Sequence, residues 1–127
     1  MADRVIVRHK SVLVIDDDPA IRISLAELLT DRGYETLTEC DGASALDLLN
    51  SLMGCSKEVP SVMLVDIAMP HLDGYEFVAA LRCRPEVPAV RLILMSACAP
   101  LALPPGAHGF VAKPFNVERL VSTIRPA

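Results

Sequence analysis

Four aspartates occupy positions from which their side chains can act together. Asp16, Asp17 and Asp18 stand side by side directly after the apolar run of residues 11–15, and Asp66 also follows an apolar run. Adjacent carboxylates repel one another, which raises the pKa of at least one of them, a cost that structure alone does not justify. A hard divalent cation such as Mg²⁺ offsets this repulsion by binding carboxylate oxygens. A carboxylate can also act as a nucleophile and form an acyl phosphate.

Two further polar side chains follow apolar runs in the same way. Ser96 comes directly after residues 91–95, and Lys113 comes directly after residues 109–112. A lysine ammonium supplies the counter-charge that a transferred phosphoryl group requires, and a serine hydroxyl supplies a hydrogen-bond donor. The sequence therefore contains the groups for phosphoryl transfer, provided that the fold brings them to one place.

The apolar runs predict how these side chains are positioned. Residues 11–15, 61–65 and 91–95 are almost continuously apolar, which is typical of parallel strands covered on both faces. Residues 35–39 and 109–112 are more polar or shorter, which favours the edges of a sheet. Helical patterns alternate with the strands, so we expect an α/β fold with a doubly wound, flavodoxin-like, five-stranded parallel sheet of order 2-1-3-4-5. In this order the first, third and fourth strands are neighbours, and their carboxyl ends meet in one cleft.

Helix-capping signals separate one aspartate from the others. Asp18 immediately precedes Pro19, and an aspartate cap followed by proline is a typical helix start, so we assign Asp18 to capping rather than to metal binding. Asp41 and Asn116 are placed to cap two further helices, and Asp73–Gly74 marks the turn before another.

Composition and charge limit the possible functions. A chain of 127 residues suits one domain, which we assign to residues 11–127 after an N-terminal extension of residues 1–10. A net charge of −4 and the absence of tryptophan argue against direct binding to nucleic acid or to a membrane surface. No apolar run is long enough for a membrane span or a secretory signal, so we expect a cytoplasmic protein. The four cysteines form no C-x-x-C pair and are predicted to be reduced, buried thiols.

Four motifs, in this order and at these strand ends, carry a resemblance to a known family. They are "VLVIDDDPAIR", "VDIAMPHLDG", "MSA" and "VAKPF". Over essentially its whole length the chain resembles the receiver domain of two-component response regulators. The combination of "DxxMPxxDG" with "KPF" is a specific signal, whereas a pair of aspartates alone would be a weak one.

The resemblance implies a phosphorylation site with a metal ion. Asp66 matches the phosphoacceptor of the family. Mg²⁺ would be bound directly by Asp17 and at Asp66, through water by Asp16, and by the backbone carbonyl of Ala68.

The resemblance also implies a set of residues that respond to the phosphoryl group. Ser96 matches the switch hydroxyl, with the N–H of Ala97 beside it. Lys113 matches the lysine that binds a phosphoryl oxygen, and the Lys113–Pro114 peptide is expected to be cis. Phe110 matches the aromatic switch, although core packing explains a phenylalanine at this position equally well.

Partners and competing functions follow from the same comparison. The resemblance implies a phosphorelay step in which a histidine kinase or a phosphotransfer protein donates the phosphoryl group, and an unknown target protein or fused output domain responds. Such a protein is not an enzyme beyond reacting with small phosphodonors and losing its own phosphoryl group. One alternative is a receiver-like interaction module that is never phosphorylated. Another is a phosphohydrolase of the haloacid-dehalogenase type, with Asp16 as nucleophile and Asp18 as acid and base, which leaves Asp66 without a role.

One segment departs from the family pattern. The stretch between Ser96 and Lys113 is about one helical turn shorter than the family's and contains Pro100, Pro104 and Pro105. Each proline inside a helix costs about 3 kcal/mol. We therefore expect the fourth helix of the family to be shortened or missing, which puts the usual partner surface in question.

Overall fold

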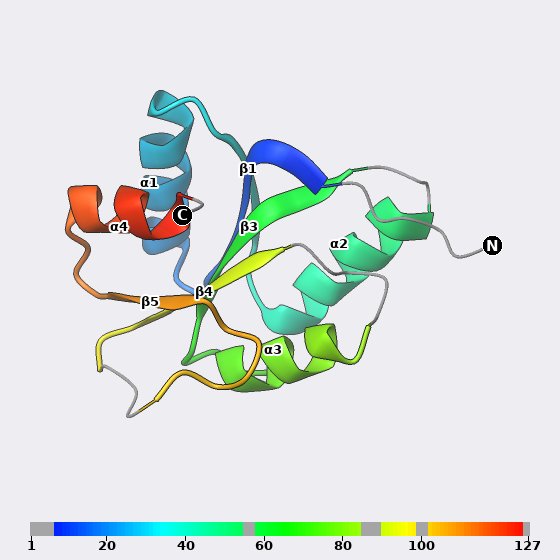
Figure 1. Ribbon diagram of the computed structural model, residues 1–127. Coiled ribbons are helices and arrows are strands. Elements are labelled where there is room, and N and C mark those ends of the chain that lie inside the picture. Colours follow the sequence, from blue (N-terminus) through cyan, green and yellow to red (C-terminus); the bar gives the residue numbers. More distant parts are fainter. Residues whose placement is uncertain (1–6, 55–57, 85–89, 99–101, 126–127) are drawn as a thin grey trace.

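The computed structural model describes residues 7–54, 58–84, 90–98 and 102–125. Strands and helices alternate along this part of the chain, except that the fifth strand follows the fourth with no helix between them in the described residues (Figure 1). In chain order they are β1 (Val7–Ile15), α1 (Pro19–Asp31), β2 (Glu35–Glu39), α2 (Gly42–Gly54), β3 (Val59–Asp66), α3 (Gly74–Arg82), β4 (Arg91–Ser96), β5 (Gly109–Ala112) and α4 (Val117–Ile124).

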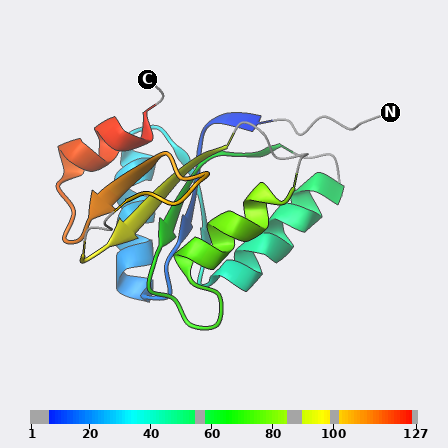
Figure 2. The same cartoon turned by 60° about the horizontal axis from the view of Figure 1, so that its bottom comes forward.

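The five strands form one parallel sheet in the order β2-β1-β3-β4-β5. Helices α1 and α4 cover one face of the sheet, and helices α2 and α3 cover the other (Figure 2). The predicted flavodoxin-like fold and strand order are confirmed. The two more polar strands, β2 and β5, form the edges, as their composition predicted.

The core consists of two layers, because successive side chains of a strand point to opposite faces. In β1, Leu13 and Ile15 pack toward α2 and α3, while Val12 and Val14 pack toward α1 and α4. The central strands β3 and β4 follow the same alternation, and their buried side chains are almost all apolar. This two-sided burial explains why the strands read as continuous apolar runs in the sequence.

Strand β1 begins at Val7, four residues earlier than its apolar run indicated. Val7 pairs with Val59 of β3, so residues 7–10, which the sequence assigned to an N-terminal extension, belong to the sheet. The register between β1 and β3 shifts between Arg8 and Val12, and Lys10 has a positive φ of 52°. Residues 8–10 are polar, so the apolar pattern of the sequence did not indicate that the strand begins this early.

The connection between β4 and β5 contains no helix in residues 97–98 and 102–108, which are the part of it that the structure describes. The prediction of a shortened or missing fourth helix is confirmed, although Pro100 lies outside the described residues. The connection is held to α3 by a side chain: the guanidinium of Arg82 donates two hydrogen bonds to the carbonyl oxygen of Gly106.

The predicted helix caps are confirmed, and one prediction about the cysteines is wrong. Asp18 and Asn116 cap α1 and α4 through their side chains, and Asp73 forms a reciprocal capping box at the start of α3. Three cysteines are free as predicted, but they are exposed rather than buried: Cys40, Cys83 and Cys98. Cys55 lies outside the described residues. No helix in the described part of the chain is long and apolar enough to cross a membrane.

Candidate functional site

The side chains that the sequence singled out lie at the carboxyl ends of the strands. Asp16 directly follows β1, Asp66 is the last residue of β3, Ser96 is the last residue of β4, and Lys113 directly follows β5. Because β1 and β3 are paired up to Ile15 and Val65, the two aspartates emerge next to each other. The parallel sheet thus brings residues that are up to 97 positions apart to one edge.

Asp16 is completely buried, and hydrogen bonds hold both its carboxylate and its backbone. Its Oδ2 accepts a hydrogen bond from Lys113 Nζ at 2.8 Å, and its Oδ1 accepts one from the backbone N–H of Asp18 at 2.9 Å. Arg22 Nη1 donates to the backbone carbonyl of Asp16 at 2.8 Å. These contacts fix the carboxylate at the start of α1. Sequence reasoning missed Arg22, because nothing in its position marks a contact with a backbone carbonyl.

Asp66 is 5% exposed and has fewer partners than Asp16. Lys113 Nζ lies 3.4 Å from its Oδ1, and the backbone N–H of Ala68 donates to the same oxygen at 3.3 Å. Burial and the negative charge of Asp16 raise the pKa of Asp66 to about 6, although Lys113 and the Ala68 N–H act in the opposite direction. The charged form of Asp66 is therefore poorly stabilised by the protein alone.

Lys113 is the cation of the site. Burial alone would lower its pKa, but the hydrogen bond and charge of Asp16, followed by the charge of Asp66, raise the pKa above its usual value. Its backbone N–H donates to the carbonyl oxygen of Ser96 at 2.9 Å, which links the ends of β4 and β5. The predicted cis peptide between Lys113 and Pro114 is confirmed.

The carboxylates fit a hard metal ion. Ligand oxygens of Asp16, Asp17 and Asp66 all lie within 4.8 Å of one another, and the carboxylate of Asp17 is exposed to solvent. Oxygen donors close together, with room for water on one side, suit Mg²⁺. Asp18 does not belong to this group, because its Oδ1 accepts a hydrogen bond from the N–H of Ala20 as the cap of α1.

The remaining predicted residues lie around this group at different depths. The hydroxyl of Ser96 accepts a hydrogen bond from the N–H of Cys98 at 3.2 Å, and both Ala97 and Cys98 are exposed. Ala68 is exposed as well, so no bulky side chain stands at these positions. Phe110 is half-buried and packs against the core layer under α2 and α3, as the packing interpretation of this residue requires.

Gly74 brings α3 into close contact with the end of β3. Its N–H donates to the carbonyl oxygen of Ile67 at 3.0 Å. A Cβ atom at this position would lie 2.8 Å from the carbonyl oxygen of Asp66, which is closer than real Cβ contacts allow. The glycine in "LDG" therefore permits a close approach as well as a turn, and the sequence indicated only the turn.

Comparison with known proteins agrees with this geometry. The sequence model of the response regulator receiver domain matches residues 12–125. The probable transcriptional regulator ycf27 of Porphyra purpurea is 36% identical over 120 residues, which cover 93% of this chain and 47% of that protein. Sporulation initiation phosphotransferase F of Bacillus subtilis (strain 168) is 30% identical over 122 residues, which cover 92% of each chain. The chain spans about half the length of the ycf27 regulators that it matches.

A solved structure has the same architecture. Chemotaxis protein CheY4 of Vibrio cholerae superposes with a TM-score of 0.74 at 29% identity, covering 94% of this chain and 96% of that one. Because the sheet order, the polar strand ends and the match over residues 12–125 all agree, this chain belongs to the response regulator receiver domain family, whose members are signalling proteins rather than enzymes.

Proposed function

We propose that this chain is a phosphorylatable signalling switch in which Asp66 accepts a phosphoryl group from a phosphohistidine in the presence of Mg²⁺. The grouping of Asp66, Asp16 and Lys113 within hydrogen-bond reach is the observation that carries the proposal. A buried nucleophile next to a second carboxylate and a lysine is a costly arrangement for stability. Phosphoryl transfer gives that arrangement a purpose, because it needs a nucleophile, a cation and a metal together.

The reaction assigns one task to each side chain. A carboxylate oxygen of Asp66 attacks the phosphorus, a P–O bond forms, and the P–N bond of the phosphohistidine breaks. The released imidazole takes up a proton from solvent. The ammonium of Lys113 pairs with an oxygen of the transferred group and neutralises part of its charge. Arg22, which contacts the carbonyl of Asp16, keeps the start of α1 in place during this change.

Mg²⁺ completes the charge balance of the site. The side chains of Asp16, Asp17 and Asp66 and the backbone carbonyl of Ala68 would hold it. When bound, it offsets the negative charge of the carboxylates and of the phosphoryl oxygens.

The switch is proposed to act through β4 and β5. The hydroxyl of Ser96 turns toward the phosphoryl group, the N–H of Ala97 donates to it, and Phe110 moves in response. One observation supports this role: the hydroxyl of Ser96 is the acceptor in its hydrogen bond with the N–H of Cys98, so its own proton can be donated to a phosphoryl oxygen. The proposed donor is a histidine kinase or a phosphotransfer protein, and the receiver of the signal is a target protein or an attached output domain.

The second candidate is a receiver-like interaction module that is not phosphorylated. The observation that favours it is the absence of a helix in the described part of the connection between β4 and β5, which alters a surface of the fold. The phosphohydrolase alternative has no such support, since Asp18 caps α1 and Asp16 is bound to Lys113.

Phosphorylation by a small donor distinguishes the two candidates. The protein is incubated with acetyl phosphate and Mg²⁺, and its intact mass is measured by mass spectrometry. We expect one phosphoryl adduct in the wild type, and no adduct in Asp66→Asn or when EDTA replaces Mg²⁺. A wild-type protein that stays unmodified while a known receiver domain reacts in the same tube would favour the interaction module.

A further inference from the structure

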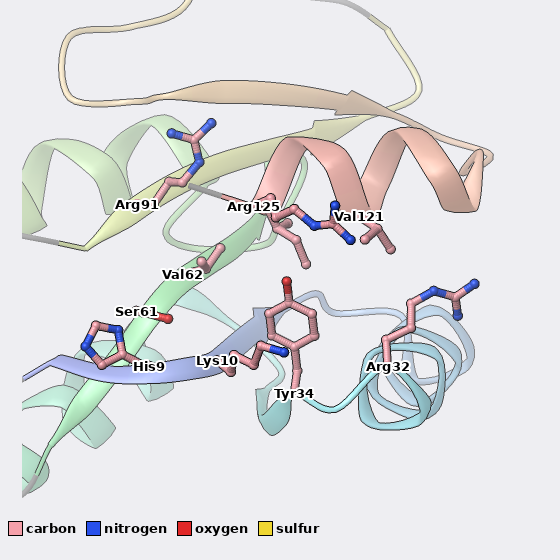
Figure 3. A pocket seen from close by; sticks show the side chains of 10 residues that line it. His9, Lys10, Arg32, Tyr34, Ser61, Val62, Arg91, Val121 and Arg125 are labelled. Carbon is pink, nitrogen blue, oxygen red and sulfur yellow. The ribbon is translucent and has the colours of Figure 1, made fainter. Parts of the chain in front are cut away.

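A second recessed site lies at the other end of the sheet from the carboxylates. It is a cavity of about 920 Å³ between α1, α4 and the amino-terminal halves of β1, β3 and β4 (Figure 3). Sites for small molecules have volumes of roughly 300–1,000 Å³. The phosphorylation proposed above uses none of the residues that line this cavity.

Cationic side chains surround the cavity. Lys10, Arg32, Arg91 and Arg125 all line it, and the described residues that line it include no aspartate or glutamate. This is unexpected for a chain whose net charge is −4. Within the described residues, Lys10, Arg32 and Arg125 take part in no ion pair. Like charges around one space repel each other and create a positive potential, so the cavity favours an anion.

The inner wall of the cavity is apolar. Val62 and Ile124 are buried, and Val121 is half-buried. The half-buried ring of Tyr34 stands between β1 and α4, with its hydroxyl directed toward α4 (Figure 3). An inorganic anion gains nothing from such a wall, because it remains hydrated. The wall instead favours an organic body that displaces water from apolar surface.

The polar rim is held by specific backbone contacts. Lys10 has a φ of 52°, in a region that residues other than glycine rarely occupy, at the point where the register of β1 shifts. Ser61 Oγ donates to the carbonyl oxygen of Ser11 at 3.0 Å across this irregular pairing. On the opposite wall, Arg91 Nε donates to the carbonyl oxygen of Thr123 at 3.1 Å. Strain at a single residue, supported by its surroundings, is a feature of functional sites.

We propose that this cavity binds a small organic anion, with a flat apolar body against Val62 and Tyr34 and a phosphate or carboxylate group among Lys10, Arg32 and Arg125. Guanidinium groups suit both head groups, because their parallel N–H donors match two oxygens at once. The site is independent of the carboxylates at the other end of the sheet. Helix α1 nevertheless extends from one site to the other, since it begins beside Asp16 and ends beside Arg32.

A titration with matched probes tests the chemistry of the ligand. The probes are 1-naphthyl phosphate, 1-naphthoate, 1-naphthol and inorganic phosphate, each added to ¹⁵N-labelled protein and followed by NMR. We expect at least one of the two naphthyl anions to bind and to shift the amide signals of Val62, Val121 and Ile124; the tighter one identifies the head group. 1-Naphthol and inorganic phosphate should bind roughly tenfold more weakly or not at all, because each lacks one half of the ligand.

Four results would overturn the proposal, and the first three concern which probes bind. In the first, neither naphthyl anion binds. In the second, 1-naphthol binds as tightly as the naphthyl anions, which would show that only apolar contacts hold the probe. In the third, inorganic phosphate binds as tightly as the naphthyl anions, which would show that only the positive charge of the surface attracts it. Signals that shift only around Asp66 would also overturn it, because the anion would then occupy the other site.

Substitutions of exposed arginines test the location without endangering the fold. Arg125→Gln and Arg32→Gln should each weaken the binding of the naphthyl anion roughly tenfold, the cost of one lost charge-assisted contact. Arg119→Gln is the matched control, because Arg119 is an exposed arginine of α4 that does not line the cavity. All three variants should react with acetyl phosphate as the wild type does. Binding that survives both cavity substitutions, or that Arg119→Gln weakens equally, contradicts the assignment.

Discussion

The ammonium of Lys113 is bound to the carboxylate of Asp16, with 2.8 Å between Lys113 Nζ and Asp16 Oδ2. The same nitrogen lies 3.4 Å from Asp66 Oδ1. The lysine thus pairs most closely with a proposed metal ligand rather than with the proposed phosphoacceptor. In the metal-free protein the ammonium of Lys113 neutralises part of the charge of Asp16. We therefore expect Mg²⁺ and Lys113 to compete for the same carboxylate.

Removal of Lys113 should therefore strengthen metal binding and weaken phosphorylation. In Lys113→Met, Mg²⁺ is expected to bind severalfold more tightly, because the competing ammonium is gone, while the reaction with acetyl phosphate slows. Isothermal titration and intact-mass measurements follow the two effects. Lys10→Met, at the other end of the sheet, is the matched control and should change neither. Unchanged or weaker Mg²⁺ binding in Lys113→Met would refute the competition.

The neighbouring aspartates Asp17 and Asp18 should differ in their effect on metal binding. Asp17→Ala removes a proposed ligand, so Mg²⁺ affinity should fall by at least roughly tenfold. Asp18→Ala removes the cap of α1, which costs about 1 kcal/mol of stability but leaves the metal ligands in place. Metal titration and thermal unfolding of both variants separate the two roles. Equal losses of affinity would mean that the aspartates are wrongly assigned.

The raised pKa of Asp66 predicts how stability depends on pH. The carboxyl has a pKa of about 6 in the folded protein, against an ordinary value of 3.8, so the unfolded state loses its proton first. The protonated carboxyl of Asp66 therefore adds to the free energy of unfolding below about pH 4, and this contribution is lost as the pH rises through 6. Without Mg²⁺, the free energy of unfolding of Asp66→Asn should therefore increase relative to that of the wild type over this pH interval.

The gain of Asp66→Asn at neutral pH is expected to reach at most about 3 kcal/mol, since one pKa unit corresponds to about 1.4 kcal/mol. Urea unfolding in EDTA at pH 4 and pH 7.5 measures it. The two proteins should be nearly equally stable at the lower pH. If the difference in the free energy of unfolding between the two proteins is the same at pH 4 and pH 7.5, the buried charge of Asp66 does not destabilise the wild type.

Loss of the phosphoryl group should be slow. Hydrolysis of an acyl phosphate needs a water molecule in line with the phosphorus, and Ala68 and Cys98 offer no amide or carboxylate to orient one. Ala68→Asn should accelerate dephosphorylation, whereas Ala68→Leu, of similar size but without an amide, should not. Phosphate release from the phosphorylated proteins gives the rates. An equal rate in wild type and Ala68→Asn would contradict the explanation.

The parts of the fold that depend on apolar periodicity could be predicted from the sequence. The runs that became β3 and β4 are buried on both faces, so they stand out, and a parallel sheet then places Asp16 and Asp66 together at its edge. The prolines in the connection before β5 predicted that a helix would be shortened or missing there, since proline lacks the N–H that a helix needs, and residues 97–98 and 102–108 indeed contain none.

Other features depend on contacts that no local pattern encodes. The start of β1 at Val7 relies on pairing with β3 across an irregular register. The preference of Lys113 for Asp16 depends on sub-ångström side-chain geometry. The cavity near Lys10 and Arg125 combines residues from distant elements, each of which looks like an ordinary surface residue in the sequence.

The most direct test of the account is to locate the phosphoryl group on the chain. Borohydride reduces an aspartyl phosphate to homoserine, so protein treated with acetyl phosphate and Mg²⁺, then reduced and digested, retains a record of the modified position. We predict homoserine at position 66 in the wild type, and none there when Mg²⁺ is omitted. Homoserine at position 16 or 17 instead, or none anywhere in protein whose intact mass shows the adduct, would contradict the assignment of Asp66 as the phosphoacceptor.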